Sequence, residues 1–111
     1  MSCLDCHQPH GTRNGALLRG ANNRTCFRCH GEYEGPYVFE HEAILTEGCQ
    51  RCHDPHGSVN RHLLIRQQVA QVCYECHTVT PASHVQPNRR DCTRCHVDIH
   101  GSSIDPRFLE Q

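Results

Sequence analysis

Five copies of the pattern Cys-x-x-Cys-His constrain this 111-residue chain more than any other feature. Two thiols three residues apart, followed at once by an imidazole, fit covalent attachment of haem c, in which the thiols form thioethers and the imidazole ligates the iron. The sequence therefore predicts five covalently bound haems c, with five iron ions. The predicted attachment residues are Cys3, Cys6, Cys26, Cys29, Cys49, Cys52, Cys73, Cys76, Cys92 and Cys95. The predicted proximal iron ligands are His7, His30, His53, His77 and His96.

A single Cys-x-x-Cys pair would also fit a redox dithiol or half of a zinc site. With 11 histidines in 111 residues, a histidine after all five pairs would arise by chance in about one case in 10^5. Zinc has no need of that histidine, and five pairs cannot be divided into four-cysteine sites without a remainder. Because the motifs contain all ten cysteines, no thiol remains for a disulfide or a nucleophile.

The composition argues against an ordinary side-chain core. Only 36% of the residues are hydrophobic, there is no tryptophan, and the mean hydropathy is -0.68. The haems are therefore expected to replace the missing core, so that the chain without haem would be largely unfolded. The predicted fold is a single pentahaem cytochrome c domain over residues 1–111, mostly irregular with a few short α-helices and negligible β-structure. Its haems are expected to form an elongated array.

An internal repeat divides the chain. Residues 3–18 match residues 49–64 at an offset of 46, and a second motif follows each copy, at Cys26 and Cys73. The predicted units are residues 3–48, residues 49–91 and a half unit over residues 92–111. A linear repeat of this kind is typical of arrays in which each unit contacts chiefly its neighbours.

The local pattern predicts few regular elements. Apolar residues at helical spacing predict a helix over residues 63–77, and Asn22-Asn23 predicts the start of a short helix before Cys26. The two Pro-His-Gly stretches at residues 9–11 and 55–57 predict turns, and residues 31–36 and 78–88 predict loops. The tail after Gly101 is expected either to dock through Phe108 and Leu109 or to fray.

Six histidines lie outside the motifs, and five haems require five distal ligands. Met1 is the only methionine and lies at a terminus, so histidine on both sides of each iron is the natural solution. His62 aligns with Ala16 of the other repeat and is expected to be a surface residue. The predicted distal ligands are His10, His41, His56, His84 and His100.

Chain reach limits which iron each distal histidine can serve. His10 follows His7 by three residues, which span at most about 10 Å when extended. Two ligands on opposite faces of one iron need backbones further apart than that. His10, His56 and His100 are therefore expected to serve haems other than the one attached just before each of them.

Charge and hydropathy limit where this protein can be located and what it can bind. The formal net charge is -1 and there is no basic tract, so nothing supports nucleic-acid binding. Haem c is attached outside the cytoplasm, so the chain is expected to be exported. No apolar signal segment precedes Cys3, which indicates a mature or excised form, and no run reaches the length of a membrane-spanning helix.

Three stretches carry a resemblance to a known family. Residues 39–41, residues 47–60 and the closing stretch from Cys92 to Ser102 resemble the periplasmic decahaem cytochromes of the MtrA/DmsE type, and match one pentahaem half of them. The chain is also similar to the pentahaem donor to periplasmic nitrite reductase. The resemblance implies an extended haem wire with bis-histidine ligation, in the periplasm or associated with the outer membrane or extracellular. It further implies a quinol-dehydrogenase-type cytochrome as donor, a terminal reductase or outer-membrane cytochrome as acceptor, and an outer-membrane porin as a further partner.

The expected function is electron transfer between redox partners outside the cytoplasm, as in anaerobic respiration or extracellular electron transfer. Five six-coordinate haems leave no open iron for a substrate, so no enzyme activity is expected. Two alternatives stay open. One is a subunit of a polymeric cytochrome nanowire, with a histidine such as His62 ligating a haem of the next subunit. The other is a multihaem reductase, although the familiar pentahaem nitrite reductase has a lysine-ended motif and this chain has no lysine.

Overall fold

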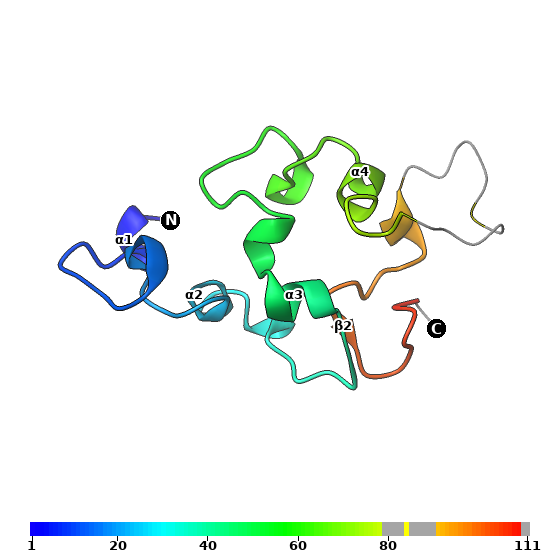
Figure 1. The fold of residues 1–111 in the computed structure, drawn as a ribbon, viewed down its shortest axis with the longest axis horizontal. Coiled ribbons are helices and arrows are strands. Elements are labelled where there is room, and N and C mark those ends of the chain that lie inside the picture. The colour runs from blue at the N-terminus through cyan, green and yellow to red at the C-terminus, as the bar shows by residue number, and fades with distance from the viewer. Residues whose placement is uncertain (79–83, 85–90, 110–111) are drawn as a thin grey trace. The chain divides into compact units, whose positions relative to one another are not determined.

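The computed structural model describes residues 1–78, 84 and 91–109, and its regular elements are all short (Figure 1). The α-helices are α1 (Cys3–Cys6), α2 (Arg24–Phe27), α3 (Glu42–Thr46) and α4 (Val69–Cys73), and the strands are β1 (Phe39–Glu40) and β2 (Gly101–Ser102). The 3-10 helices are η1 (Gly15–Leu17), η2 (Gly31–Tyr33), η3 (Cys49–Arg51), η4 (Arg61–Leu63) and η6 (Cys92–Arg94). The prediction of a mostly irregular chain with a few short helices and negligible β-structure is confirmed.

The chain divides into two compact units. The first comprises Met1–Pro36 and carries the first two motifs, and the second comprises Tyr37–Gln111 and carries the other three. The predicted loop over residues 31–36 contains η2, and most of the predicted loop over residues 78–88 lies outside the described residues.

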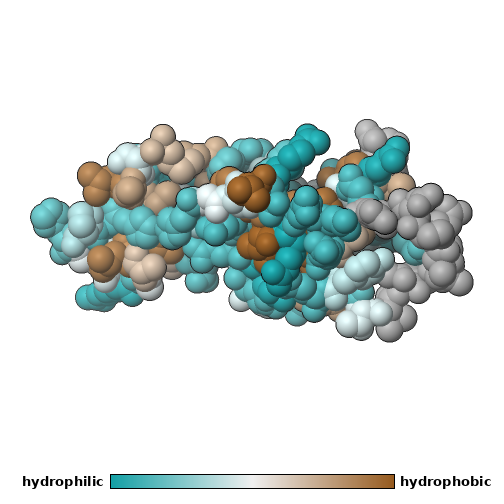
Figure 2. All heavy atoms as spheres, turned by 90° about the horizontal axis from the view of Figure 1, so that it is seen from above, coloured by the Kyte–Doolittle hydropathy of each residue, from teal (hydrophilic) through white to brown (hydrophobic). Residues whose placement is uncertain are grey.

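The described residues of neither unit form a side-chain core. Ala70 is the one buried hydrophobic residue among those described. Large apolar side chains lie exposed among hydrophilic ones, as on the face drawn in Figure 2. Those at least half exposed include Leu4, Val38, Leu45, Val59, Tyr74 and Ile104. The polypeptide alone therefore buries too little apolar surface to offset the entropy of ordering its backbone.

Local capping explains where α1 and α4 begin. Ser2 and Asp5 form a capping box on α1, and Gln68 and Gln71 do the same on α4. The helix α2 starts after Asn23, as predicted, although the Asn23 side chain does not cap it.

The helix predicted over residues 63–77 is wrong at both ends. Only Val69–Cys73 is α-helical, because His62 and Leu63 have φ angles of 55° and 56°. That left-handed conformation cannot continue into an α-helix, and non-glycine residues adopt it at a cost. The apolar spacing from Ile65 onward therefore does not reflect one continuous helix.

The two-residue sheet aligns two distant histidines. Strands β1 and β2 pair antiparallel, with Phe39 opposite Ser102 and Glu40 opposite Gly101. The next residues in this register are His41 and His100, one residue beyond the pairing. Residues in such positions of neighbouring strands lie about 5 Å apart, so the sheet places these two histidines side by side.

Substituting Gly101 tests this arrangement. Its φ is 146°, and a Cβ there would overlap the ring of Tyr37. We expect Gly101→Ala to lower the stability of the haem-loaded protein by about 1–3 kcal/mol, because it combines backbone strain with a steric clash. The matched control is Gly31→Ala, where a Cβ meets nothing within 4 Å. Equal thermal unfolding midpoints for the two variants would contradict the arrangement.

The described part of the C-terminal tail, up to Leu109, docks instead of fraying. The backbone N–H of Asp98 donates to the carbonyl of Phe108 at 3.2 Å, and the ring of Phe108 lies 5.6 Å from the ring of His41. Asp105 is only 3% exposed and is held by the Arg107 side chain at 3.2 Å.

In the described part of the chain no helix is long and apolar enough to cross a membrane.

Candidate functional site

All five motifs adopt the same single helical turn. In each, the backbone N–H of the histidine donates to the carbonyl of the first cysteine, at distances from 2.8 to 3.0 Å. Residues three apart on such a turn lie on the same face, so both thiols are presented together with the imidazole on the following residue. None of the ten cysteines forms a disulfide, so their sulfur atoms are available for thioether bonds.

Three motif histidines are oriented by a backbone carbonyl. The Nδ1 of His7 lies 2.7 Å from the carbonyl oxygen of Ala16, and that of His53 lies 2.6 Å from the carbonyl oxygen of His62. The Nδ1 of His96 lies 2.6 Å from the carbonyl oxygen of Arg107. A carbonyl can only accept, so Nδ1 carries the proton and Nε2 is left to bind a metal. Such partners fix the tautomer and the ring direction of ligating histidines.

The backbone is strained at or next to the residues whose carbonyls accept from these histidines. Ala16 and Leu17 have φ angles of 52° and 55°, nearly the same as His62 and Leu63 in the second copy, and Phe108 has a φ of 59°. Left-handed non-glycine residues cost about 1–3 kcal/mol each and persist where the surroundings hold them.

The repeated polar residues hold the turns in place. Thr12 Oγ1 and Asn14 Nδ2 both donate to the carbonyl of Leu18, at 3.0 and 2.9 Å. Ser58 Oγ and Asn60 Nδ2 donate in the same way to the carbonyl of Leu64, each at 2.7 Å. The sequence pattern did not identify Ala16, His62 and Arg107 as the residues whose carbonyls accept from the motif histidines. The repeated pattern Thr/Ser-x-Asn-x-x-Leu-Leu could have pointed to Ala16 and His62.

Three pairs of imidazole rings lie at one separation. The ring centres of His41 and His77 are 6.2 Å apart, those of His53 and His100 are 6.3 Å apart, and those of His84 and His96 are 6.1 Å apart. The interplanar angles are 26°, 21° and 18° respectively. Every pair joins one motif histidine to one of the predicted distal histidines.

The separation fits a shared metal ion. A metal–imidazole nitrogen bond is about 2.0 Å long, and the nitrogen lies about 1.1 Å from the ring centre, so two imidazoles on opposite sides of one ion have centres about 6.2 Å apart. The residues of this chain therefore fit haem iron with an imidazole on each face. Burial, with the nearby imidazoles of His53 and His41, lowers the pKa of His100. The lowered pKa favours the neutral ring, which is the form that binds a metal.

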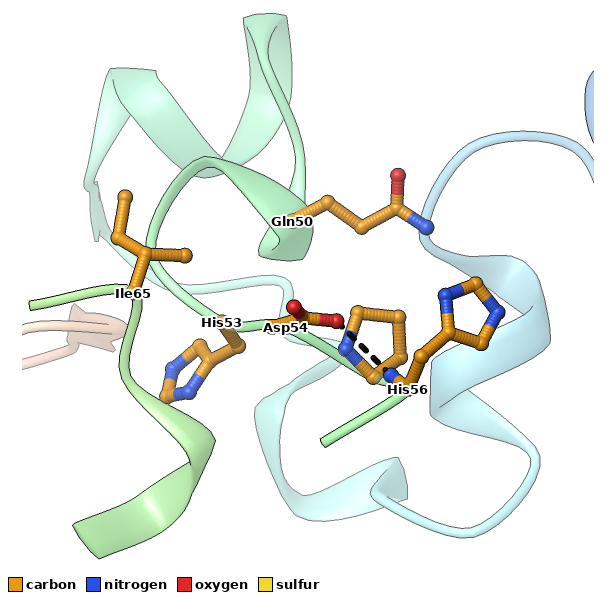
Figure 3. Close-up of a pocket in the computed structure, with 6 residues that line it drawn as sticks. Gln50, His53, Asp54, His56 and Ile65 are labelled. Carbon is orange, nitrogen blue, oxygen red and sulfur yellow. Dashed lines mark hydrogen bonds between the residues drawn. The ribbon is translucent and has the colours of Figure 1, made fainter. Parts of the chain in front are cut away.

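His53 of the third motif and His56, three residues after it, face different ways. A cavity of about 300 Å³ is lined by Gln50, His53, Asp54, Pro55, His56 and Ile65. Figure 3 shows the rings of His53 and His56 pointing away from each other, with Asp54 accepting a hydrogen bond from the backbone N–H of His56 at 2.9 Å. This arrangement prevents both rings from meeting on one iron. His10 and His56 occupy equivalent Pro-His-Gly turns, each followed by a glycine with a left-handed φ.

The motifs of the second unit are close neighbours. Burial and the adjacent thiol of Cys92 raise the pKa of Cys73 to about 12, which disfavours a reactive thiolate at neutral pH. Glu75, between the cysteines of the fourth motif, forms ion pairs with Arg66 and with Arg51 of the third motif, both at 2.8 Å. These arginines, Arg66 first, lower the pKa of Glu75 and keep its carboxylate ionised.

Comparison with known proteins agrees with this geometry. The family model described as a doubled CXXCH motif matches residues 1–35 and 41–82. The chain is similar to a multihaem cytochrome MtrA of Shewanella baltica, with 38% identity over 120 aligned residues that cover 93% of this chain. The chain spans about a third of that relative's length, 35%. The motif turns, the paired imidazoles and both comparisons lead to one conclusion: the chain belongs to the multihaem c-type cytochromes of the doubled CXXCH family, and carries covalently bound haem c.

Proposed function

We propose that this chain is an electron conduit that binds five haems c, each ligated by two histidines. Haem iron supplies the chemistry, because it changes between the ferric and ferrous states without binding a substrate. The observation that carries the proposal is the common ring separation of 6.1–6.3 Å in three histidine pairs.

The ring pairs support three sets of iron ligands. His53 with His100 would hold the third haem, His77 with His41 the fourth, and His96 with His84 the fifth. The first two haems would be held on His7 and His30, and the predicted distal ligands that these three pairs do not use are His10 and His56. His30 lies 3.6 Å from the carboxylate of Glu32, a contact through Nδ1 that leaves its Nε2 for the iron.

Close spacing follows from two contacts in the second unit. With His41 and His100 as distal ligands, the register of β1 and β2 would make the third and fourth haems neighbours. Cys92 lies close enough to Cys73 to raise the pKa of its thiol, so the fourth and fifth haems would be neighbours. Short steps of this kind favour electron transfer from haem to haem, since electron tunnelling weakens steeply with distance.

The partners and the location are part of the proposal. An exported cytochrome of this kind would lie in the periplasm or at the outer membrane. It would take electrons from a quinol-dehydrogenase-type cytochrome and pass them to a terminal reductase or an outer-membrane cytochrome, with or without a surrounding porin. With both axial positions of each iron filled by histidine, the chain would have no enzyme activity of its own.

Protein-film voltammetry of the haem-loaded chain tests the function. We expect broad, reversible waves at low potential, because bis-histidine ligation lacks the potential-raising methionine and the centres interact. Nitrite, hydroxylamine and sulfoxides should leave these waves unchanged. A catalytic current with any of the three would overturn the conduit in favour of a reductase.

A further inference from the structure

In each two-haem repeat, the residues that directly precede the second cysteine of the two motifs carry opposite charges. The residue just before the second cysteine is Asp5 in the first motif and Arg28 in the second. At the equivalent places in the next unit it is Arg51 and Glu75. The order of the charges is reversed between the units, but one basic and one acidic residue are present in each.

Both pairs are in contact. Arg51 Nη1 lies 2.8 Å from Glu75 Oε2, and Arg28 Nη1 donates to the backbone carbonyl of Asp5 at 2.8 Å. The carboxylate of Asp5 is occupied at the start of α1, where it accepts from the N–H of Ser2 at 2.6 Å. In each two-haem repeat, an arginine therefore connects the attachment turns of two consecutive motifs.

The contact in the second repeat, between Arg51 and Glu75, involves more side chains than the one in the first repeat. Glu75 uses one oxygen for Arg51 and the other for Arg66, and Arg51 also lies 2.6 Å from Glu47. The side chains of Arg51 and Glu75 are 33% and 21% exposed, so water screens their pairing less than that of a fully exposed pair. The side chain of Arg51 also lies beside Cys76, one of the two attachment residues of the fourth motif.

We propose that Arg51 and Glu75 are positioning residues that set the spacing and relative orientation of the third and fourth haems. Arg51 directly precedes Cys52, and Glu75 directly precedes Cys76, so the ion pair fixes one attachment bond of each haem relative to the other. Arg66 and Glu47 hold the pair from either side. Because the pair acts on bound haems, this role rests on the proposed function.

The test is a double-mutant cycle on the full haem-loaded chain, with Arg51→Gln, Glu75→Gln and the double variant. The control is Arg94→Gln, because Arg94 occupies the same place in the fifth motif and no ion pair of it is recorded among the described residues. The readout of geometry is the exciton signal in the Soret circular dichroism, which depends on how neighbouring haems face each other. The readout of charge is the set of reduction potentials.

The two readouts should behave differently. Each single variant should lose exciton amplitude, and the double variant should lose no more than a single one, since all three remove the same contact. The potentials should shift in opposite directions in the two single variants, because one loses a positive charge and the other a negative charge. In the double variant those shifts should largely cancel.

Three results would overturn the positioning role. They are an unchanged exciton signal in both single variants, losses that add in the double variant, or an equal loss in Arg94→Gln. A variant that fails to retain its haems is replaced by the conservative Arg51→Lys or Glu75→Asp, which should keep the signal. Failure of the proposed function would appear separately, as a catalytic current in the unaltered chain.

Discussion

Replacing His41 with alanine is expected to leave every haem attached and to turn one of them high-spin. His41 contributes no thioether, so attachment through Cys73 and Cys76 does not depend on it. Its ring centre lies 6.2 Å from that of His77, so the fourth iron would lose one of its two imidazoles. A five-coordinate haem iron is high-spin. Optical and electron paramagnetic resonance spectra should show this change in one of the proposed haems. Intact mass would show that no haem is lost.

The matched control is His62→Ala. His62 contributes its backbone carbonyl to His53, and Ala16 does the same for His7, so alanine can fill that place. The spectrum of this variant should therefore equal that of the unaltered chain. If His62→Ala becomes high-spin, or if His41→Ala stays low-spin, the pairing of the imidazoles is wrong.

Removing the haems should have the largest effect of all, namely loss of the folded state. Ala70 is the one buried hydrophobic residue among those described. Each attachment turn is a single turn of helix, and isolated helices shorter than about 12–15 residues are marginal in water. A chain produced in the cytoplasm, without haem attachment, should show a disordered circular dichroism spectrum and rapid cleavage by protease.

The same chain exported and loaded with haem is the control for that experiment. It should unfold cooperatively on heating and resist the protease. A cooperative thermal transition in the haem-free chain would mean that the polypeptide carries its own core, and would contradict the account of the fold.

What the sequence could predict was local. The attachment turns, the Pro-His-Gly turns and the scarcity of strands follow from residue types at short spacing, and the repeat exposed the equivalence of Ala16 and His62. The continuous helix over residues 63–77 was wrong because the left-handed conformation of His62 and Leu63 depends on supporting hydrogen bonds that helical periodicity does not report.

Long-range placement could not be read from the sequence. Two-residue strands such as β1 and β2 have no pattern of their own, and their register depends on where the tail docks. The alignment of His41 with His100 therefore appears only in the structure. The same is true of the carbonyl of Arg107, which follows His96 by 11 residues in place of the 9 that separate His7 from Ala16 and His53 from His62.

The central claim is that every iron of this chain is held between two imidazoles. It is tested most directly by the electron paramagnetic resonance spectrum of the fully oxidised, haem-loaded chain. The account predicts low-spin ferric signals alone, with no high-spin component at neutral pH. A high-spin ferric signal from one or more irons of the unaltered chain would contradict it, because it would show an iron with an open axial position.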